Sequence, residues 1–332
     1  MLSQLDLRQH QFKSTTYASP IKGARIIITG AVHGNEICGT HAIRRVMDEL
    51  QSGQLQQIAG TLTLVPVVNT LAYQLGQRHG HRNLNRRLRP TQYIAEFEDH
   101  VANWLCPLLA QHDILLDLHS FRGQGSPFVM VGPENNGDAV EPFGYAAEEE
   151  ILALRLGVNR FVDGWLSTYA RGVERRRASL EQAGDHHALQ NVDAQFGVGT
   201  TEYMRSVGGH ALTLECGQHQ DPMAPQVAYQ AIVNTLRQLG ILAGEKPSVV
   251  EHREALRIYD VIDKAHANDG FSRAWASFDA IKKGDLIATR HDGSIIIADM
   301  DGCIIFPDAN AAPGEEWFYL AKHNPRFYIN VA

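Results

Sequence analysis

The chain has 332 residues, of which 44% are hydrophobic and 20% are charged, and its formal net charge at pH 7 is −7. This composition is typical of a globular protein with a large core, and the negative charge disfavours general binding to nucleic acid. The N-terminus lacks the pattern of a signal peptide, and no apolar run approaches the ~18 residues that a membrane span requires. The four cysteines are widely spaced, so we expect reduced thiols in a cytoplasmic protein without a membrane partner.

The first candidate site follows the first predicted strand. Residues 25–30 form an apolar, β-branched run that predicts a buried strand ending at Gly30. His33 and Glu36 come next, at the expected start of a helix, where i, i+3 spacing lets an imidazole nitrogen and a carboxylate oxygen converge. Gly34 leaves room between them for a close approach of backbone or of a bound group. We predict two zinc ligands here and a third from another segment.

A basic loop follows the second predicted strand. Apolar residues at helical spacing predict a helix that ends at Gly53, and residues 61–68 predict a strand in which Pro66 indicates an edge or a bulge. Five arginines lie between 78 and 89, whereas residues 51–95 contain neither Asp nor Glu. A solvated surface loop is the alternative interpretation. Because arginine suits forked recognition of carboxylates, we interpret the segment as an anion-binding loop.

The next predicted strand ends in a histidine. A helix is predicted over residues 94–108, disturbed near its end by Pro107. Residues 113–119 form a predicted buried strand that closes with His119, and Asp117 lies on the same face because side chains two positions apart point the same way. An aspartate beside a ligating histidine can fix its tautomer, so Asp117 is predicted to support a metal ligand.

Strands and helices alternate through the centre of the chain. The sequence predicts a strand over 126–131, helices over 146–156 and 161–170, a loop over 182–199, a strand over 210–215 and a helix over 228–239. This alternation predicts an α/β domain with a mixed, largely parallel central sheet flanked by helices. Glu215 ends its strand, where a carboxylate is unfavourable without a partner or a task. His186 and His187 are interpreted as surface residues of the loop, because adjacent side chains point apart.

A second unit is predicted near the C-terminus. Gly244-Glu-Lys-Pro247 marks its boundary, and glycines nine residues apart, at 284, 293 and 302, separate short apolar stretches. This spacing predicts a small all-β domain, either a sandwich or a barrel. We therefore expect an α/β domain over residues 1–245 and a β domain over residues 246–332.

The candidate ligands form a recognisable set. His33, Glu36 and His119 make a His₂Glu group, the pattern of a catalytic zinc with an open fourth position, and the chain offers one such set. Glu215 is the remaining acid placed to take a proton from water and pass it to a leaving amine. An arginine of the 78–89 loop can polarise a carbonyl. The residues thus predict one zinc per chain and hydrolysis of an amide.

Four motifs in this order resemble a known family: His33-Gly-Asn-Glu36, Asn83-Leu-Asn-Arg86, Asp117-Leu-His119 and Thr213-Leu-Glu215. They are similar to those of the succinylglutamate desuccinylase and aspartoacylase family, which is related to the zinc carboxypeptidases. The resemblance extends from about Ile26 to Lys322 and includes the C-terminal β unit. It implies a zinc carboxypeptidase-like sheet, with the β unit narrowing the entrance to the site.

The resemblance also implies roles for individual residues. The His₂Glu set would bind zinc, and Glu215 would be the general base and acid. Arg78 would polarise the scissile carbonyl, Asn85 and Arg86 would hold a substrate carboxylate, and Arg205 would contact the acidic end of the substrate. The implied substrate is a small anionic N-acyl amino acid, and a homo-oligomer is left open.

One departure limits the implied substrate. Where aspartoacylases carry a Tyr and a Lys that grip the acidic end, this chain has Pro313-Gly-Glu315-Glu316, and no basic residue follows before Lys322. Zinc-dependent amide hydrolysis is compatible with this difference. Acetylaspartate or succinylglutamate as the substrate does not follow.

Three alternatives stay open at this point. A zinc carboxypeptidase acting on short peptides would use the same ligands with an open groove. Residues 281–288 resemble half of a biotinyl or lipoyl carrier barrel, and Asp263-Lys264-Ala265 resembles the modified lysine of such carriers. A metal-binding protein without enzymatic activity is the third, although the presence of Glu215 argues against a decayed site.

Overall fold

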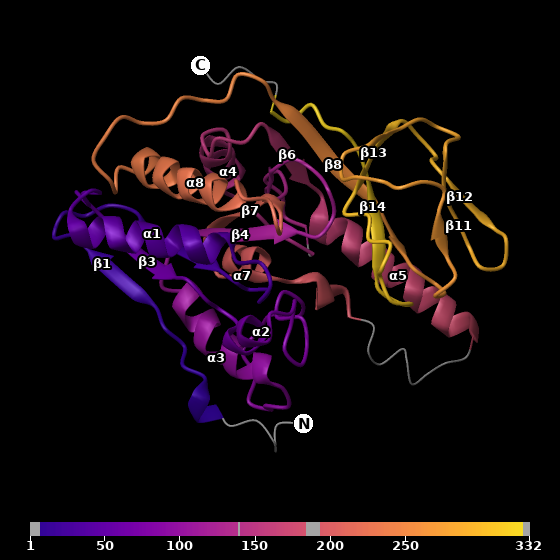
Figure 1. The fold of residues 1–332 in the computed structure, drawn as a ribbon, viewed down its shortest axis with the longest axis horizontal. Helices are drawn as coiled ribbons and strands as arrows, with labels where there is room; N and C mark the ends of the chain where they lie inside the picture. The colour runs from indigo at the N-terminus through magenta and orange to yellow at the C-terminus, as the bar shows by residue number, and fades with distance from the viewer. Residues whose placement is uncertain (1–6, 139, 184–192, 328–332) are drawn as a thin grey trace.

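The structure, a computed structural model, describes residues 7–138, 140–183 and 193–327 (Figure 1). The helices are α1 Cys38–Ser52, α2 Thr70–Leu75, α3 Phe97–Leu109, α4 Ala146–Ala153, α5 Trp165–Ala183, α7 Thr200–Ser206 and α8 Ala224–Gln238, with 3₁₀ turns η2 Leu7–Gln9 and η3 Ala194–Gly197. The strands are β1 Thr15–Ala18, β2 Arg25–Gly30, β3 Thr61–Val65, β4 Ile114–Phe121, β5 Phe128–Met130, β6 Arg160–Asp163, β7 His210–Gln218, β8 Glu254–Asp263, β9 Gly270–Phe271, β10 Ala280–Ile281, β11 Leu286–Thr289, β12 Ile295–Ile297, β13 Gly302–Ile305 and β14 Glu316–His323.

One large sheet organises the molecule. Among the described residues it has eleven strands in the order β1-β3-β2-β4-β7-β5-β6-β8-β14-β13-β10. Strands β3, β2, β4 and β7 run parallel, whereas β5 is antiparallel to β7 and the strands from β14 onward are antiparallel. The predicted fold class, a mixed and largely parallel sheet with flanking helices and an antiparallel C-terminal region, is confirmed.

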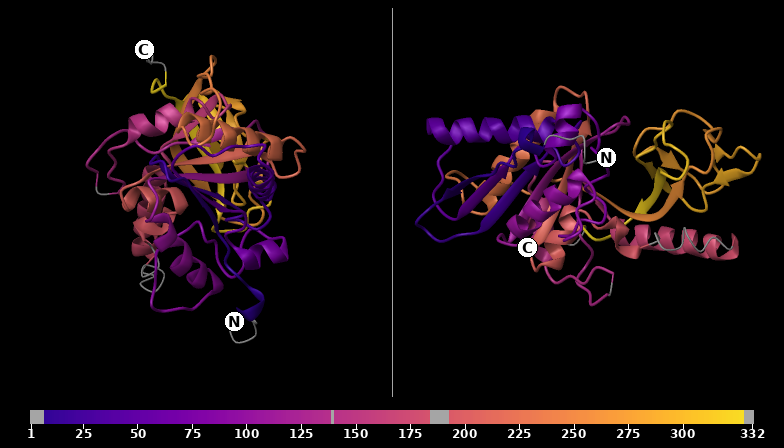
Figure 2. Two further views of the ribbon diagram at one scale, coloured as in Figure 1. Left: turned by 90° about the vertical axis from the view of Figure 1, so that its left-hand side faces the viewer. Right: turned by 90° about the horizontal axis from the view of Figure 1, so that it is seen from below.

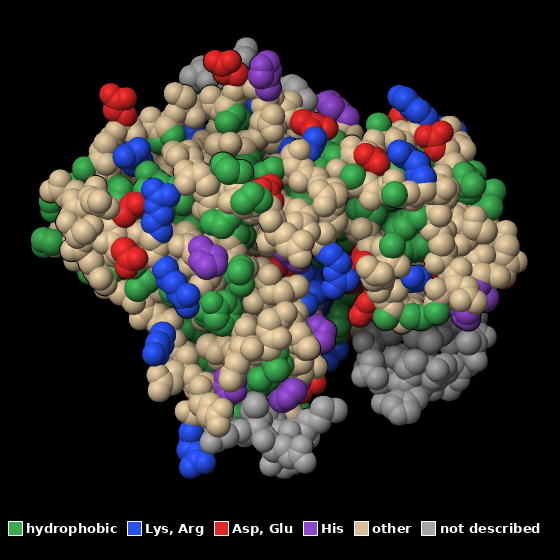
Figure 3. Space-filling view, viewed as in Figure 1, with side chains coloured by type: hydrophobic (Ala, Val, Ile, Leu, Met, Phe, Trp, Pro, Cys, Tyr) green, Lys and Arg blue, Asp and Glu red, His purple; other side chains and the backbone are tan. Residues whose placement is uncertain are grey.

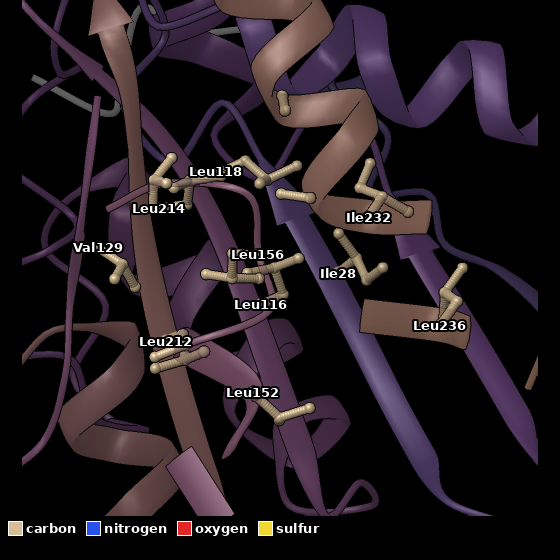
Figure 4. Packing of buried hydrophobic residues seen from close by; sticks show 14 of the residues in the cluster. Ile28, Leu116, Leu118, Val129, Leu152, Leu156, Leu212, Leu214, Ile232 and Leu236 are labelled. Carbon is tan, nitrogen blue, oxygen red and sulfur yellow. The ribbon is translucent and has the colours of Figure 1, made fainter. Parts of the chain in front are cut away.

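The central strands form because both of their faces are buried. Ile26, Ile27 and Ile28 of β2 are fully buried, as expected for β-branched residues in a parallel sheet covered on both sides. Burial of each such side chain contributes about 1.5–3 kcal/mol. Ile26 and Ile28 belong to a core cluster that includes α1 and α8, whereas Ile27 belongs to a cluster with α3 on the opposite face. Figure 4 shows Ile28 together with Ile232 and Leu236 of α8 in the first cluster.

The C-terminal strands form a smaller lobe beside the main body. Strands β8, β14, β13 and β10 continue the large sheet, and β12, β11 and β9 form a separate antiparallel sheet. Figure 2 shows this lobe set off from the helical layers, with α5 running alongside it. The division of the chain at residue 245 stays a prediction, since β8 pairs with β6 of the preceding segment.

Several element predictions differ from the structure. α1 begins at Cys38, so His33 and Glu36 lie in the preceding loop rather than on the helix. Strand β3 ends at Val65, before Pro66, and lies between β1 and β2 instead of at an edge. The helix predicted over 161–170 is instead strand β6 followed by α5, because Gly164, at φ 87°, turns the chain between the two.

Two further observations concern the earlier predictions. His186 and His187 lie outside the described residues. Within the described ranges, none of the helices is long and apolar enough to cross a membrane.

Candidate active site

The candidate residues gather at the carboxyl ends of neighbouring parallel strands. β2 pairs with β4 up to Gly30 and Leu118, and in the next strand pair His119 is opposite Glu215 of β7. This is the edge at which open α/β sheets bind ligands. The loop after β2 packs against α2, because a Cβ added to Gly34 would lie 1.9 Å from the carbonyl carbon of Ala72. Backbone, rather than a bound group, therefore requires the glycine.

Three buried side chains point their ligand atoms at one another. Nδ1 of His33 lies 2.8 Å from Oε1 of Glu36, and Nδ1 of His119 lies 2.8 Å from Oε2 of the same carboxylate. These atoms lie within 4.8 Å of one another, and each residue is at most 2% exposed. Of the residues that the structure describes, His33, Glu36 and His119 are the ones grouped closely enough to hold a metal ion.

The outer nitrogens of both imidazoles are fixed by hydrogen bonds. Nε2 of His33 donates to Oδ1 of Asn83 at 3.0 Å, and Nε2 of His119 donates to Oδ2 of Asp117 at 2.8 Å. Asp117 also accepts a hydrogen bond from Thr29 at 2.6 Å. These bonds turn Nδ1 of each histidine toward Glu36, and Nδ1 of His33 has no hydrogen-bond partner. A buried carboxylate between two inward imidazole nitrogens fits the ligand set of Zn²⁺.

The electrostatics of the group are compatible with a bound cation. Burial lowers the pKa of His33 to about 4, so its ring is neutral, as a metal ligand must be. Burial alone would favour the neutral form of Glu36, but the two histidines hold the pKa of this carboxyl well below its usual range. For His119, burial is outweighed by the charges of Asp117 and Glu36, which raise its pKa well above 6.5. A divalent cation would replace that proton between the nitrogen and Glu36.

Glu215 lies next to the ligands with one oxygen unpaired. The residue is 8% exposed, and its Oε2 has no hydrogen-bond partner. Burial, followed by the charge of Glu36, raises the pKa of Glu215 to about 8. A carboxyl group in this environment binds a proton more tightly than it does in water, which suits a group that accepts and returns protons.

The basic loop lies over the same site and is anchored by Glu98 of α3. Nη1 of Arg78 donates to Oε1 of Glu36 at 2.8 Å, and the Arg78 side chain is 43% exposed. The Glu98 carboxylate is fully buried and accepts hydrogen bonds from the backbone N–H groups of Gly80, His81 and Arg82 at 2.9–3.2 Å. Sequence reasoning missed Glu98, because a single acid in an amphipathic helix gives no signal of a distant partner.

Asn85 and Arg86 line the same cavity. Oδ1 of Asn85 accepts a hydrogen bond from the backbone N–H of Thr200 at 2.8 Å. Arg86 is 8% exposed, and its Nη2 donates to Oε1 of Glu316 at 3.1 Å. Arg86, which was expected to hold a substrate carboxylate, is therefore already paired with the carboxylate of Glu316.

Arg205 lines the same cavity as the candidate ligands but lies within an acidic cluster. Its Nε donates to Glu149 at 2.8 Å and its Nη1 to Glu141 at 3.0 Å, while Glu202 lies 3.6 Å away. The side chain is 4% exposed. The predicted contact with a substrate's acidic end stays a prediction, and three internal carboxylates now surround this guanidinium.

A cavity of about 790 Å³ connects these groups. The residues that line it include His33, His119 and Glu215, segments near Trp165 of α5, and residues 306–308 and 314–316 of the C-terminal lobe. Figure 3 shows basic and acidic side chains meeting in the hollow between the main body and the smaller lobe. The C-terminal lobe thus contributes one wall of the cavity.

Two further residues near the ligands were not predicted. The backbone N–H of Ser120 donates to Oε2 of Glu36 at 3.3 Å, and Oγ of Ser120 lies 2.9 Å from Nδ1 of His219. Ser120 directly follows His119, so its position beside a predicted ligand was the available signal. His219 follows β7 and had no motif around it.

The mixed, largely parallel sheet thus carries a buried His₂Glu group at the carboxyl ends of its central strands. Residues 22–147 match the family model described as the succinylglutamate desuccinylase/aspartoacylase catalytic domain. The matched segment contains the three candidate ligands and Arg78, Asn85 and Arg86, whereas Arg205 and Glu215 lie beyond it. The family resemblance inferred from the motifs is confirmed, and the family is one of hydrolases.

Solved structures share the fold over nearly the whole chain. The product-bound ectoine utilization protein EutE (DoeB) from Ruegeria pomeroyi has a TM-score of 0.68 at 19% identity, covering 93% of this chain and 88% of that one. A succinylglutamate desuccinylase/aspartoacylase from Rhodobacter sphaeroides has a TM-score of 0.68 at 17% identity, covering 94% of this chain and 90% of that one. A succinylglutamate desuccinylase from Silicibacter sp. TM1040 gives 0.69 at 18%, with 94% and 89% covered. No curated protein sequence matches the chain.

Proposed function

We propose that this protein is a zinc-dependent hydrolase that cleaves the amide bond of a small N-acyl amino acid. The observation that carries the proposal is the unpaired Nδ1 of His33, which lies 2.8 Å from a buried carboxylate oxygen. Two lone pairs at this distance repel each other unless a proton or a metal cation lies between them, and the low pKa of His33 disfavours the proton. Glu215, with its own unpaired oxygen, provides the proton-transfer group beside this cation site.

The residues divide the work of hydrolysis. A zinc ion held by His33, Glu36 and His119 would supply Lewis acidity and lower the pKa of a water molecule. Glu215 takes the proton of the attacking water and returns it to the departing amine. Arg78 donates to the carbonyl oxygen as negative charge develops there, since its guanidinium lies at Glu36 and faces the cavity.

The cavity supports a small substrate. Its volume of about 790 Å³ suits a compact molecule, and residues of the C-terminal lobe form one wall. A carboxypeptidase needs a groove that continues along a peptide, which this wall would interrupt. Asn85 and Arg86 line this cavity, and we assign them to binding of the α-carboxylate of the substrate.

The carrier alternative has less support. Lys264 is 6% exposed, and its Nζ donates to the carbonyl oxygen of Ala309 at 3.0 Å. A lysine that carries a prosthetic group must be accessible to the modifying enzyme and free to swing. A buried, hydrogen-bonded lysine meets neither requirement.

The test combines metal analysis with a substrate panel. We expect the purified protein to bind about one zinc per chain and to release amine from N-acyl amino acids more readily than from dipeptides. His119→Ala should lose metal and activity together, because two ligands do not hold a catalytic zinc. His41→Ala, on the exposed face of α1, is the matched control and should retain both.

Two results would contradict the proposal. Full activity of the metal-free protein would exclude a catalytic zinc. Faster release of C-terminal residues from dipeptides than of amines from N-acyl amino acids would favour the carboxypeptidase alternative.

A further inference from the structure

The strongest unexplained feature of the cavity is the pairing of Arg86 with Glu316. Nη2 of Arg86 donates to Oε1 of Glu316 at 3.1 Å, and Nη1 donates to the backbone carbonyl of Asn85 at 2.9 Å. The guanidinium carbon lies 5.2 Å from the centre of the Trp165 ring and 5.3 Å from that of Tyr169. Two hydrogen bonds and two aromatic rings therefore fix the group in place beside the carboxylate.

Glu316 presents a negative charge to the cavity. It begins β14 and lines the cavity, and its side chain is 24% exposed. Burial opposes ionisation, but Arg86 and the more distant Arg78 hold the pKa of this carboxyl below its usual range. Glu316 lines the same cavity as the candidate ligands His33 and His119.

The rest of the cavity has the same charge pattern. Among the described residues that line it, eight are acidic and five are arginines. Each arginine has a carboxylate at 2.8–3.7 Å: Arg78 has Glu36, Arg86 has Glu316, Arg122 has Asp308, Arg205 has Glu149 and Arg257 has Asp163. An acidic substrate group would have to compete with these internal carboxylates for every guanidinium. A basic group meets carboxylates in excess.

The α-carboxylate and the side chain of a substrate face different requirements here. The α-carboxylate can share Arg86 with Glu316, as a guanidinium offers two edges for hydrogen bonding. A second carboxylate in the same space would lie close to Glu316 and be repelled, whereas an ammonium group would be attracted. With this charge pattern, Glu316 would distinguish substrates by the charge of the side chain.

We propose that Glu316 is a specificity-determining residue that directs the site toward N-acyl amino acids with a basic side chain and away from those with an acidic one. This inference rests on the hydrolase activity proposed above. It revises the anionic substrate implied by the family resemblance and is consistent with the acidic Pro313–Glu316 segment.

The experiment compares three Nα-acetyl amino acids of similar length. Nα-acetylornithine is basic, Nα-acetylglutamine is neutral and Nα-acetylglutamate is acidic, and the last two are nearly identical in shape. We expect kcat/KM of the zinc-loaded wild-type protein to fall in that order. In Glu316→Gln the ratio of kcat/KM for the ornithine derivative to kcat/KM for the glutamate derivative should fall by about tenfold or more, because charge recognition is lost.

Two variants control for structure. Glu316→Asp retains the charge and should retain the preference for the basic substrate. Glu315→Gln changes a neighbouring cavity carboxylate that accepts from the backbone N–H of Ala312 rather than from Arg86, so the ratio should stay near wild type. Calorimetric binding of free ornithine and glutamate should show the same discrimination without turnover.

The outcomes separate this inference from the proposed function. The role of Glu316 would be refuted if the protein hydrolyses the glutamine derivative but Glu316→Gln leaves unchanged the ratio of kcat/KM for the ornithine derivative to kcat/KM for the glutamate derivative. The proposed hydrolase function would stand in that case. A wild-type preference for the glutamate derivative would also refute it. Absence of turnover on all three substrates by zinc-loaded protein would count against the proposed function itself, and discrimination would then be visible in binding alone.

Discussion

Replacement of Glu98 by glutamine tests whether one buried carboxylate holds the basic loop of residues 78–89 in place. Its Oε1 accepts from Asn69 Nδ2 and Gly80 N–H, both at 2.9 Å, and its Oε2 accepts from the N–H groups of His81 and Arg82, both at 3.2 Å. Glutamine keeps one acceptor but points an NH₂ group at two N–H donors. Each lost charge-assisted hydrogen bond costs about 1.5–3 kcal/mol, so we expect Glu98→Gln to lower the free energy of unfolding by about 3–5 kcal/mol.

The same change should weaken catalysis, because the loop that it releases carries Arg78 and Asn85. Urea unfolding followed by circular dichroism measures the stability, and kcat/KM on the best substrate of the panel measures the activity, which should fall at least about tenfold while zinc stays bound. Glu148→Gln, an exposed acid of α4, is the control and should change stability by less than about 0.5 kcal/mol. A Glu98→Gln protein as stable and active as that control would refute the anchoring role.

Two further substitutions test the proton chemistry and the acidic cluster. Glu215→Gln should retain zinc and lose about 10²–10⁴-fold in kcat, since an amide does not shuttle protons; a loss of only a few-fold would reassign Glu215 to structure. Burial, opposed by the charge of Arg205 and assisted by that of Glu202, raises the pKa of Glu141 from 4.5 to about 7. The folded state therefore binds this proton more tightly than the unfolded state does. As a result, the free energy of unfolding falls as the pH rises from 4.5 to about 7. Glu141→Gln should remove up to about 3 kcal/mol of that fall between pH 4.5 and 8 in chemical denaturation, and an unchanged pH slope would contradict the assignment.

Local patterns were enough to predict the frame of the fold. The β-branched run of β2 and the apolar run of β4 identified strands buried on both faces, and Gly53 marked the end of α1 through its left-handed conformation, at φ 79°. Errors arose where tertiary contacts outweighed local preference. Phe161 and Val162 are part of strand β6 because β5 and β8 pair on either side of it, and no local signal distinguished this from a helix.

The candidate site divides in the same way. His33, Glu36 and His119 were found because each ligand lies at or just after the end of a recognisable strand, and the ends of parallel strands meet. The partners of the arginines were not found, because they lie far away in sequence. Glu316 is 230 residues from Arg86, and Glu149 is 56 residues from Arg205. Ion pairs of this kind depend on the assembled fold and produce no periodic pattern in the sequence.

The wall that the C-terminal lobe adds to the cavity separates two tasks along the chain. The candidate metal ligands come from loops and strand ends before residue 120, whereas Glu316 comes from a strand about 200 residues later. Sequence changes in the lobe can therefore alter which molecules enter without moving the atoms that act on them. On the proposed function, such a division would let a few substitutions in residues 308–316 change the preferred substrate while the metal ligands stay in place.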